Sequence, residues 1–385
     1  MDTQSALFSL LRLAVCDDVP TEQLKTACTE SMLEAVYALA SRHDLAHLVG
    51  QAVSKLDLPD SEILSKCKQS AMQALMRYMQ LNYEYERVCQ ALEEAQILFI
   101  PLKGAVLRAY YPEPWMRTSC DVDILVPGQD LERAISGLQE ELGYILKDRS
   151  THDVVLDSPS GVHMELHYDL VEEGRANNAI QVLSTVWQDA KPCRDRQFFH
   201  KMSDPFFYFY HIAHMAKHFE NGGCGIRPFL DLWILDLMES ADQEKRNALL
   251  EKGGLKRFAD VCRKLSRVWF GREQADDLSL QMQAFLLHGG AYGTIDNRVA
   301  LQQKKQGGRL GYLWSRVFAP REKLERYYPI LKKHRALLPF MQIRRWCMLL
   351  RPSVAGMAKR ELQVNKTVNT ESAEEMQIFL NNMGL

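Results

Sequence analysis

Apolar positions follow a helical period through the first quarter of the chain. In the stretch "SAMQALMRYMQLNYEYERVCQALEEA", one set of side chains recurs at alternating steps of three and four residues: Leu75, Tyr78, Asn82, Tyr85, Cys89 and Leu92. This spacing predicts a helix with one buried stripe. Pro59, Asp60 and Ser61 form a helix start signal ahead of it. We therefore expect residues 1–94 to form a helical region.

The period changes to two after residue 95. The short apolar runs "ILFIPL" and "CDVDILVP" predict two strands, and "DLERAISGLQEELGY" predicts an amphipathic helix that ends at Gly143. The stretch "DVVLDSPSGVHMELHYDL" then predicts a hairpin with its turn at 158–161. In the second strand of this hairpin, alternate side chains share one face: His163, Glu165, His167 and Asp169. A small mixed sheet in residues 95–175 follows from these patterns.

Helical patterns return after about residue 176 and continue nearly to the end of the chain. The clearest are "DPFFYFYHIAHMAKHFE" and "RPFLDLWILDLME", on either side of a glycine-rich break at 221–223. The predicted fold class is therefore α+β. A small mixed sheet is flanked by an N-terminal helical region, 1–94, and a C-terminal helical domain, 176–385.

Composition places the chain among globular proteins. Hydrophobic residues make up 46% and charged residues 25% of the sequence, which excludes fibrous and largely disordered classes. The nine cysteines are scattered without a Cys-x-x-Cys pair, which argues against a disulfide framework and a zinc knuckle. No run of about eighteen apolar residues occurs, and Asp2 stands where a signal peptide carries positive charge. We expect a cytoplasmic protein without a membrane span.

The net charge of −2 hides an uneven distribution. Residues 301–360 contain fifteen Lys and Arg but only two acids, Glu322 and Glu325. One interpretation is a solvated basic face; the other is a surface for nucleotide phosphates, nucleic acid or an anionic acceptor.

Two aspartates one residue apart give the strand "CDVDILVP" its candidate chemistry. Alternate residues of a strand share a face, so the carboxylates of Asp121 and Asp123 project together and repel each other unless a cation lies between them. Glu165 from a neighbouring strand would complete a set of three carboxylates, the ligand type that Mg²⁺ or Mn²⁺ prefers. The alternative is a solvated strand edge without a metal.

Two further groups suggest phosphate binding. Lys103 and Gly104 stand where a strand gives way to a helical piece, a position suited to a phosphate; the alternative is a simple turn with a solvent-exposed lysine. Arg117 either neutralises a triphosphate or pairs with the two aspartates.

Four polar residues lie at one-turn spacings on two successive predicted helices: His214, His218, Arg227 and Asp231. They form either the wall of an acceptor pocket or a buried polar network that joins the two helices.

These motifs occur in a recognisable order: Leu-Lys-Gly, Arg, Asp-x-Asp-x-Leu-Val, Glu-Leu-His-Tyr, then His-x-x-x-His, Arg and Asp-Leu. The chain thereby resembles the uncharacterised nucleotidyltransferase family of the polymerase-β-like superfamily. The resemblance implies a nucleotidyltransferase fold, an NTP substrate and a divalent metal. It also implies that Asp121 and Asp123 are metal ligands, that Glu165 is the third carboxylate, and that Lys103 and Gly104 lie in the nucleotide-phosphate loop.

One departure leaves the chemistry open. Classical members of the superfamily carry Gly-Ser in this loop and a shorter interval before Asp-x-Asp, whereas this chain has Lys-Gly and an insertion with Pro112 and Pro114. The leading hypothesis is an enzyme that transfers a nucleoside monophosphate from an NTP to an unknown acceptor. The alternatives are a phosphodiester-forming enzyme like the phosphocholine transferases, and a non-catalytic binding or scaffold protein with the same fold. Three carboxylates held together favour an enzyme, since their repulsion without a metal costs stability.

Overall fold

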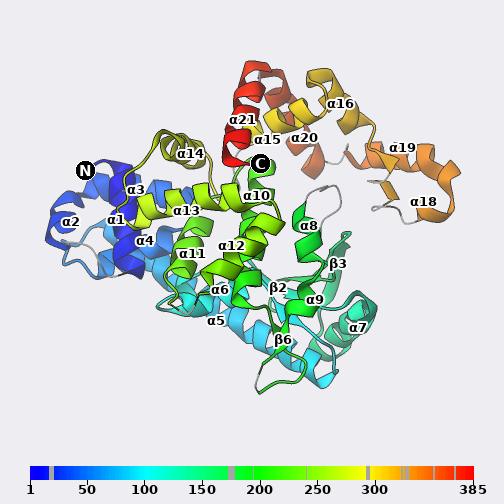
Figure 1. The fold of residues 1–385 in the computed structure, drawn as a ribbon, viewed down its shortest axis with the longest axis horizontal. Coiled ribbons are helices and arrows are strands. Elements are labelled where there is room, and N and C mark those ends of the chain that lie inside the picture. The colour runs from blue at the N-terminus through cyan, green and yellow to red at the C-terminus, as the bar shows by residue number, and fades with distance from the viewer. Residues whose placement is uncertain are drawn as a thin grey trace. The chain divides into compact units, whose positions relative to one another are not determined.

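The computed structural model describes residues 1–16, 21–171, 178–193, 195–239, 241–291, 295–321, 324–325, 328, 330–349, 352–367 and 370–385. The chain divides into two compact units, whose elements are labelled in Figure 1. The first unit comprises residues Met1–Ala213 and Ile226–Leu287, and the second comprises His214–Gly225 and His288–Leu385. The three regions expected from the sequence differ in secondary structure, but the compact units divide at other positions.

Most of the described residues among the first 94 are helical, as predicted: α1 (Thr3–Val15), α2 (Thr21–Ala27), α3 (Glu30–Arg42), α4 (Ala46–Ser54) and α5 (Glu62–Glu94). The start signal before α5 is confirmed, because the Ser61 side chain accepts a hydrogen bond from the backbone N–H of Leu64. The position of the buried stripe was partly wrong. Cys89 and Leu92 are buried, but the four predicted positions before them are only half-buried. The first half of α5 packs on α4 and the second half on the sheet, so no single stripe is covered along its whole length.

The sheet has five strands in the order β1-β2-β5-β4-β3: β1 (Ile100–Pro101), β2 (Asp121–Leu125), β3 (Ile145–Arg149), β4 (Asp153–Asp157) and β5 (His163–His167). Strands β2 and β5 are parallel, and the other neighbours are antiparallel, so the predicted mixed sheet is confirmed. The predicted hairpin is β4 and β5. The first strand is shorter than the run "ILFIPL" suggested, since only two of its residues pair with β2.

One face of the sheet is apolar and covered by helices. Val122 and Ile124 of β2 and Met164 and Leu166 of β5 are buried in a core with the second half of α5 and with α7 (Leu131–Leu142). In Figure 1, α5 runs past β2, which it contacts. The helix α7 ends at Gly143, which has a φ of 72°, as the sequence indicated. The opposite face of the sheet therefore carries the polar residues.

Short elements lie between the strands: α6 (Lys103–Leu107) and 3-10 turns at Arg108–Tyr110 and Pro114–Met116 between β1 and β2, and a 3-10 turn at Gly128–Asp130 after β2. The elements between the sheet and the later helices are α8 (Asn178–Leu183), α9 (Val186–Asp189), β6 (Lys191–Pro192) and β7 (His200–Lys201). The helices that follow are α10 (Asp204–Glu220), α11 (Arg227–Asp236), α12 (Gln243–Lys252), α13 (Lys256–Phe270) and α14 (Asp277–His288). Within the first unit, α13 returns to the N-terminal helices, where Trp269 stacks on Phe8 with ring centroids 4.6 Å apart.

The second unit contains α15 (Ile295–Lys305), α16 (Arg309–Val317), α18 (Ile330–Lys333), a 3-10 turn at Arg335–Leu337, α19 (Leu338–Leu349), α20 (Pro352–Thr367) and α21 (Thr370–Met383). Among the residues described in both units, no helix combines the length and the apolar character needed to cross a membrane. The basic segment 301–360 belongs to the second unit. Of its two acids, Glu325 pairs with Arg321, and Glu322 lies outside the described residues.

Gly50 generates a prediction about the contact of α4 with α5. A Cβ atom at Gly50 would lie 2.1 Å from the carbonyl oxygen of Cys67 in α5. We expect Gly50→Ala to lower the free energy of unfolding by about 1–3 kcal/mol in urea denaturation, because the helices must separate. Gly137 of α7 is the matched control, since a Cβ atom there meets nothing within 4 Å. Gly137→Ala should leave stability unchanged or raise it by up to about 1 kcal/mol, and equal effects of both variants would contradict the close approach.

Candidate active site

The polar face of β2 and β5 brings the predicted carboxylates together. Because the two strands are parallel and in register, Asp123 lies directly beside Glu165, and Asp121 lies beside His163. Asp123 is buried, with 3% of its surface exposed, while Asp121 and Glu165 are half-buried. The alternation of the strands predicted that Asp121, Asp123 and Glu165 share one face of the sheet, and this is confirmed.

Lys103 lies against these carboxylates. Its Nζ is 2.9 Å from Asp123 Oδ1 and 3.9 Å from Glu165 Oε2. The residue has a φ of 42° at the start of the five-residue helix α6, and this sharp turn follows β1 directly. Gly104 is buried beside it, and a Cβ atom at Gly104 would lie 3.1 Å from Ser119 Cβ. The alternative of a solvent-exposed lysine is therefore wrong, and phosphate binding by Lys103 and Gly104 stays a prediction.

The sequence interpretation missed the place of His167 in this group. Its Nε2 lies 3.1 Å from Asp123 Oδ1 and 3.4 Å from Glu165 Oε2. The signal was present in the alternation of β5, which put His167 on the face of Glu165. No chemistry was assigned to it because a lone histidine in a strand carries no specific motif.

The charges of the site are unevenly balanced. Burial and the neighbouring Asp123 raise the pKa of Asp121 to about 6. Burial alone would also raise the pKa of Asp123, but Lys103 and His167 outweigh it and hold that pKa below its ordinary value. Burial would lower the pKa of Lys103, and here Asp123 reverses the direction and raises it. The negative charge of Asp123 is thus compensated by Lys103 and His167, whereas the negative charge of Asp121 remains unfavourable.

Arg117 does not pair with the two aspartates of β2. Its Nε lies 2.6 Å from Asp231 Oδ1, and the hydroxyl of Tyr111 donates to the same oxygen at 2.7 Å. Asp231 is 0% exposed. The alternative that joined Arg117 to Asp121 and Asp123 is corrected, because α11 places a nearer carboxylate against the guanidinium. Asp231 likewise has the surroundings of a buried polar network.

A second ion pair holds the same segment before β2. Arg227 Nη1 lies 2.7 Å from Asp44 Oδ2 and donates to the carbonyl oxygen of Thr118 at 3.1 Å. The ring of His47 in α4 bonds to the carbonyl oxygen of Met116 at 2.8 Å. Residues from the N-terminal helices and from α11 therefore fasten the backbone that leads into Asp121.

His214 and His218 belong to the second unit, whereas Arg227 and Asp231 belong to the first. The two histidine rings meet edge to face, with centroids 4.5 Å apart. Their predicted role in acceptor binding stays a prediction.

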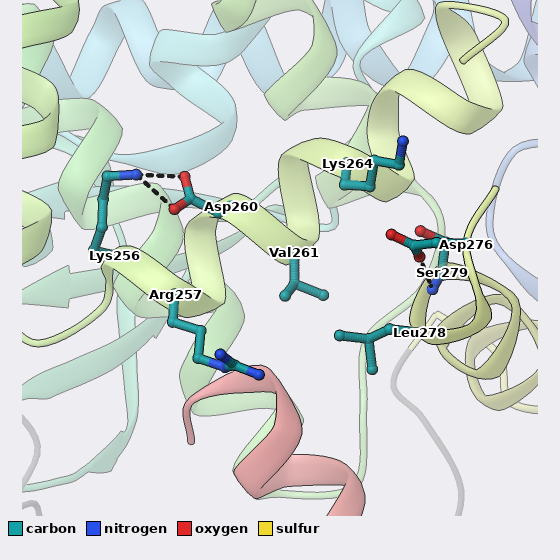
Figure 2. Close-up of a pocket in the computed structure, with 8 residues that line it drawn as sticks. All are labelled: Lys256, Arg257, Asp260, Val261, Lys264, Asp276, Leu278 and Ser279. Atoms are coloured by element: carbon teal, nitrogen blue, oxygen red, sulfur yellow. Dashed lines mark hydrogen bonds and ion pairs between the residues drawn. The ribbon is translucent and has the colours of Figure 1, made fainter. Parts of the chain in front are cut away.

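A separate hollow of about 600 Å³ lies between α13 and α14 in the first unit (Figure 2). Its lining includes Lys256, Arg257 and Lys264, but Lys256 is paired with Asp260, and Lys264 with Glu273. No predicted site residue lines this hollow, so it offers no evidence about the carboxylate site.

Comparison with known proteins identifies the family. The model of the uncharacterised nucleotidyltransferase family matches residues 29–271, well over half of the chain. The chain belongs to this family. Nucleotidyl transfer is therefore its general activity, and the resemblance inferred from the motifs is confirmed.

The other comparisons add little to this family assignment. No curated protein matches the chain. A solution structure of the antibiotic-resistance factor ANT(2'')-Ia matches with 10% identity and a TM-score of 0.28, over 54% of this chain and 98% of that chain. A likeness at that TM-score carries no argument about fold or substrate.

The donor set of this nucleotidyltransferase fits a divalent cation. Asp121, Asp123 and Glu165 offer carboxylate oxygens on one face of the sheet, and the raised pKa of Asp121 marks negative charge that Lys103 does not offset. Ligand atoms of Asp123, Glu165 and His167 also lie within 4.8 Å of one another. The three carboxylates would hold the ion.

The Arg117–Asp231 pair gives a prediction about stability. Asp231→Asn leaves the buried guanidinium of Arg117 without its counter-ion, so we expect the free energy of unfolding to fall by about 3–5 kcal/mol. The control is Asp44→Asn, because the Asp44 side chain is 44% exposed, and an exposed ion pair contributes only about 0–1 kcal/mol. Denaturant unfolding of both variants measures the difference. A stable Asp231→Asn protein with impaired acceptor kinetics would instead support the acceptor-wall alternative.

Proposed function

We propose that the chain transfers a nucleoside monophosphate from an NTP to a hydroxyl or phosphate acceptor, with Mg²⁺ or Mn²⁺ bound by Asp121, Asp123 and Glu165. The observation that supports this most directly is the parallel pairing of β2 with β5, which places Asp123 beside Glu165 on the polar face. A metal ion at these carboxylates would neutralise phosphate charge and lower the pKa of an attacking hydroxyl.

The residues of the chain divide the remaining work. Lys103 keeps Asp123 ionised and brings positive charge to the edge of the site, where the NTP phosphates would lie. Glu165 contacts Lys103 only at 3.9 Å, and 27% of its side chain is exposed, so it can accept a proton. The acceptor oxygen attacks the α-phosphorus, the bond to the β-phosphate oxygen breaks, pyrophosphate leaves, and the hydroxyl proton passes to Glu165.

The proposal about the acceptor is based on the charge of one segment of the chain. The basic segment 301–360 favours an anionic acceptor, with nucleic acid as one such partner. Lys-Gly in place of Gly-Ser also keeps the phosphocholine-transferase-like reaction as an alternative. A screen of the purified protein with labelled NTPs and with a CDP-linked alcohol, each with Mg²⁺ or Mn²⁺, separates the two reactions. A non-catalytic scaffold would turn over neither donor.

Asp121 provides the test of metal-dependent nucleotide binding. Asp121→Asn removes one ligand, so we expect metal-dependent nucleotide binding to be lost in calorimetry. In EDTA, the free energy of unfolding of this variant should be unchanged or higher, because the repulsion with Asp123 disappears. The matched control is Asp157→Asn on β4, whose carboxylate pairs with His163. Wild-type nucleotide affinity in Asp121→Asn would contradict the metal site.

Glu165 provides the test of proton transfer. Glu165→Gln keeps the shape of the side chain and an amide oxygen that can still face the metal, which Asp121 and Asp123 continue to hold, but it cannot accept the proton. Turnover should therefore fall by a factor of about a hundred or more, with nucleotide affinity changed far less. Single-turnover kinetics and equilibrium binding measure the two quantities separately. If affinity collapsed while turnover survived, Glu165 would have to be reassigned to nucleotide binding.

A further inference from the structure

His167 is the one imidazole that the described structure places against both paired carboxylates of β2 and β5, beside the Lys103 ammonium, which also contacts both. It is buried, with 5% of its surface exposed. It comes from the same strand as Glu165 and lies two residues later, so the sheet holds both side chains on the polar face.

The separations of its Nε2 atom match those of ligands that share one ion. Two donor atoms bound at about 2.1 Å to the same cation lie roughly 3 to 4 Å apart. His167 Nε2 lies 3.1 Å from Asp123 Oδ1 and 3.4 Å from Glu165 Oε2. A modest adjustment of these side chains would therefore turn the three atoms toward a single centre.

A second group supports the ring from β4. Asp153 is the direct neighbour of His167 across the β4–β5 pairing. Ligand atoms of Asp153, His152 and His167 lie within 4.8 Å of one another, and His152 Nε2 is 2.9 Å from Asp153 Oδ2. Histidines that bind metals are usually oriented by a nearby carboxylate. Asp153 pairs with His152 in this structure, and its carboxylate lies near enough to His167 to take that part when a metal is bound.

We propose that His167 is a metal ligand, together with Asp123 and Glu165, and that the site therefore prefers a first-row transition ion such as Mn²⁺ to Mg²⁺. The proposal rests on the proposed function, which places the metal at these carboxylates. Mg²⁺ favours all-oxygen coordination, whereas an imidazole nitrogen adds affinity for transition ions. The all-carboxylate set implied by the family resemblance contains no such preference.

The first experiment reads the coordination directly. Mn²⁺ is added to the full chain, and pulsed electron paramagnetic resonance detects the magnetic coupling of the bound ion to ¹⁴N. We expect an imidazole coupling in the wild-type protein. Bound Mn²⁺ without ¹⁴N coupling would overturn the proposal, and this result does not depend on whether any variant folds.

The second experiment measures affinity. His167→Gln should weaken Mn²⁺ binding about 10- to 100-fold in calorimetry, with a smaller change for Mg²⁺ measured by competition. His163→Gln is the matched control, since His163 lies on the same strand and face but pairs with Asp157 at 2.8 Å. It should keep both the Mn²⁺ affinity and the ¹⁴N coupling. Wild-type Mn²⁺ affinity and an unchanged metal preference in His167→Gln would overturn the proposal.

The two proposals fail in different ways. If Asp121→Asn abolishes Mn²⁺ binding while His167→Gln leaves it intact, the metal-dependent function stands and the role of His167 is wrong. If the wild-type protein binds no divalent ion with or without an NTP, both are wrong.

Discussion

The site depends on the burial of one charged carboxylate, that of Asp123. A buried carboxylate is costly unless it is paired, and Asp123 is paired by Lys103 at 2.9 Å and by His167 at 3.1 Å. Lys103 comes from the turn after β1, and His167 from β5, so the charge joins two strands that lie on either side of β2. Among the residues that the structure describes, the same arrangement leaves Asp121 without a comparable partner. The side chain of Asp123 is therefore held in place by its ion pairs, whereas the negative charge of Asp121 is not balanced by such pairs.

A second buried charge positions the approach to β2. Arg117 and Asp231 connect the segment before Asp121 to α11, and Tyr111 completes this contact. Removing one member of such a pair is costly, so the backbone entering β2 is held more firmly than a connecting loop usually is. The nucleotidyltransferase sheet is small. Helical regions that precede and follow it in the sequence hold the segment that leads into β2. Family membership over residues 29–271 is consistent with that arrangement, since the matched part includes α11 as well as the sheet.

Local signals predicted much of the fold. The Ser61 cap, the Gly143 terminus and the hairpin turn at 158–161 were each predicted from residues within a few positions of one another, and each is confirmed. The alternation of β2 and β5 also predicted which side chains share the polar face. The stripe of α5 was less well predicted, because a helix that packs on α4 and then on the sheet has two buried faces in succession.

The sequence by itself determined most of the helices, four of the five strands of the sheet, the alternation of β2 and β5 and the family motifs, because these depend on neighbouring residues. The strand β3 was not among the predicted elements. The tertiary structure alone decided the partners of the charges. Lys103 lies twenty residues from Asp123, and Arg117 lies 114 residues from Asp231. Nothing in the local pattern shows that Lys103 pairs with Asp123. Nor does it show that Arg117 pairs with Asp231 and not with Asp121, which is nearer to it in the sequence. Ion pairing depends on distance in space and on burial, and both are set only when β1, β2, β5 and α11 have packed together.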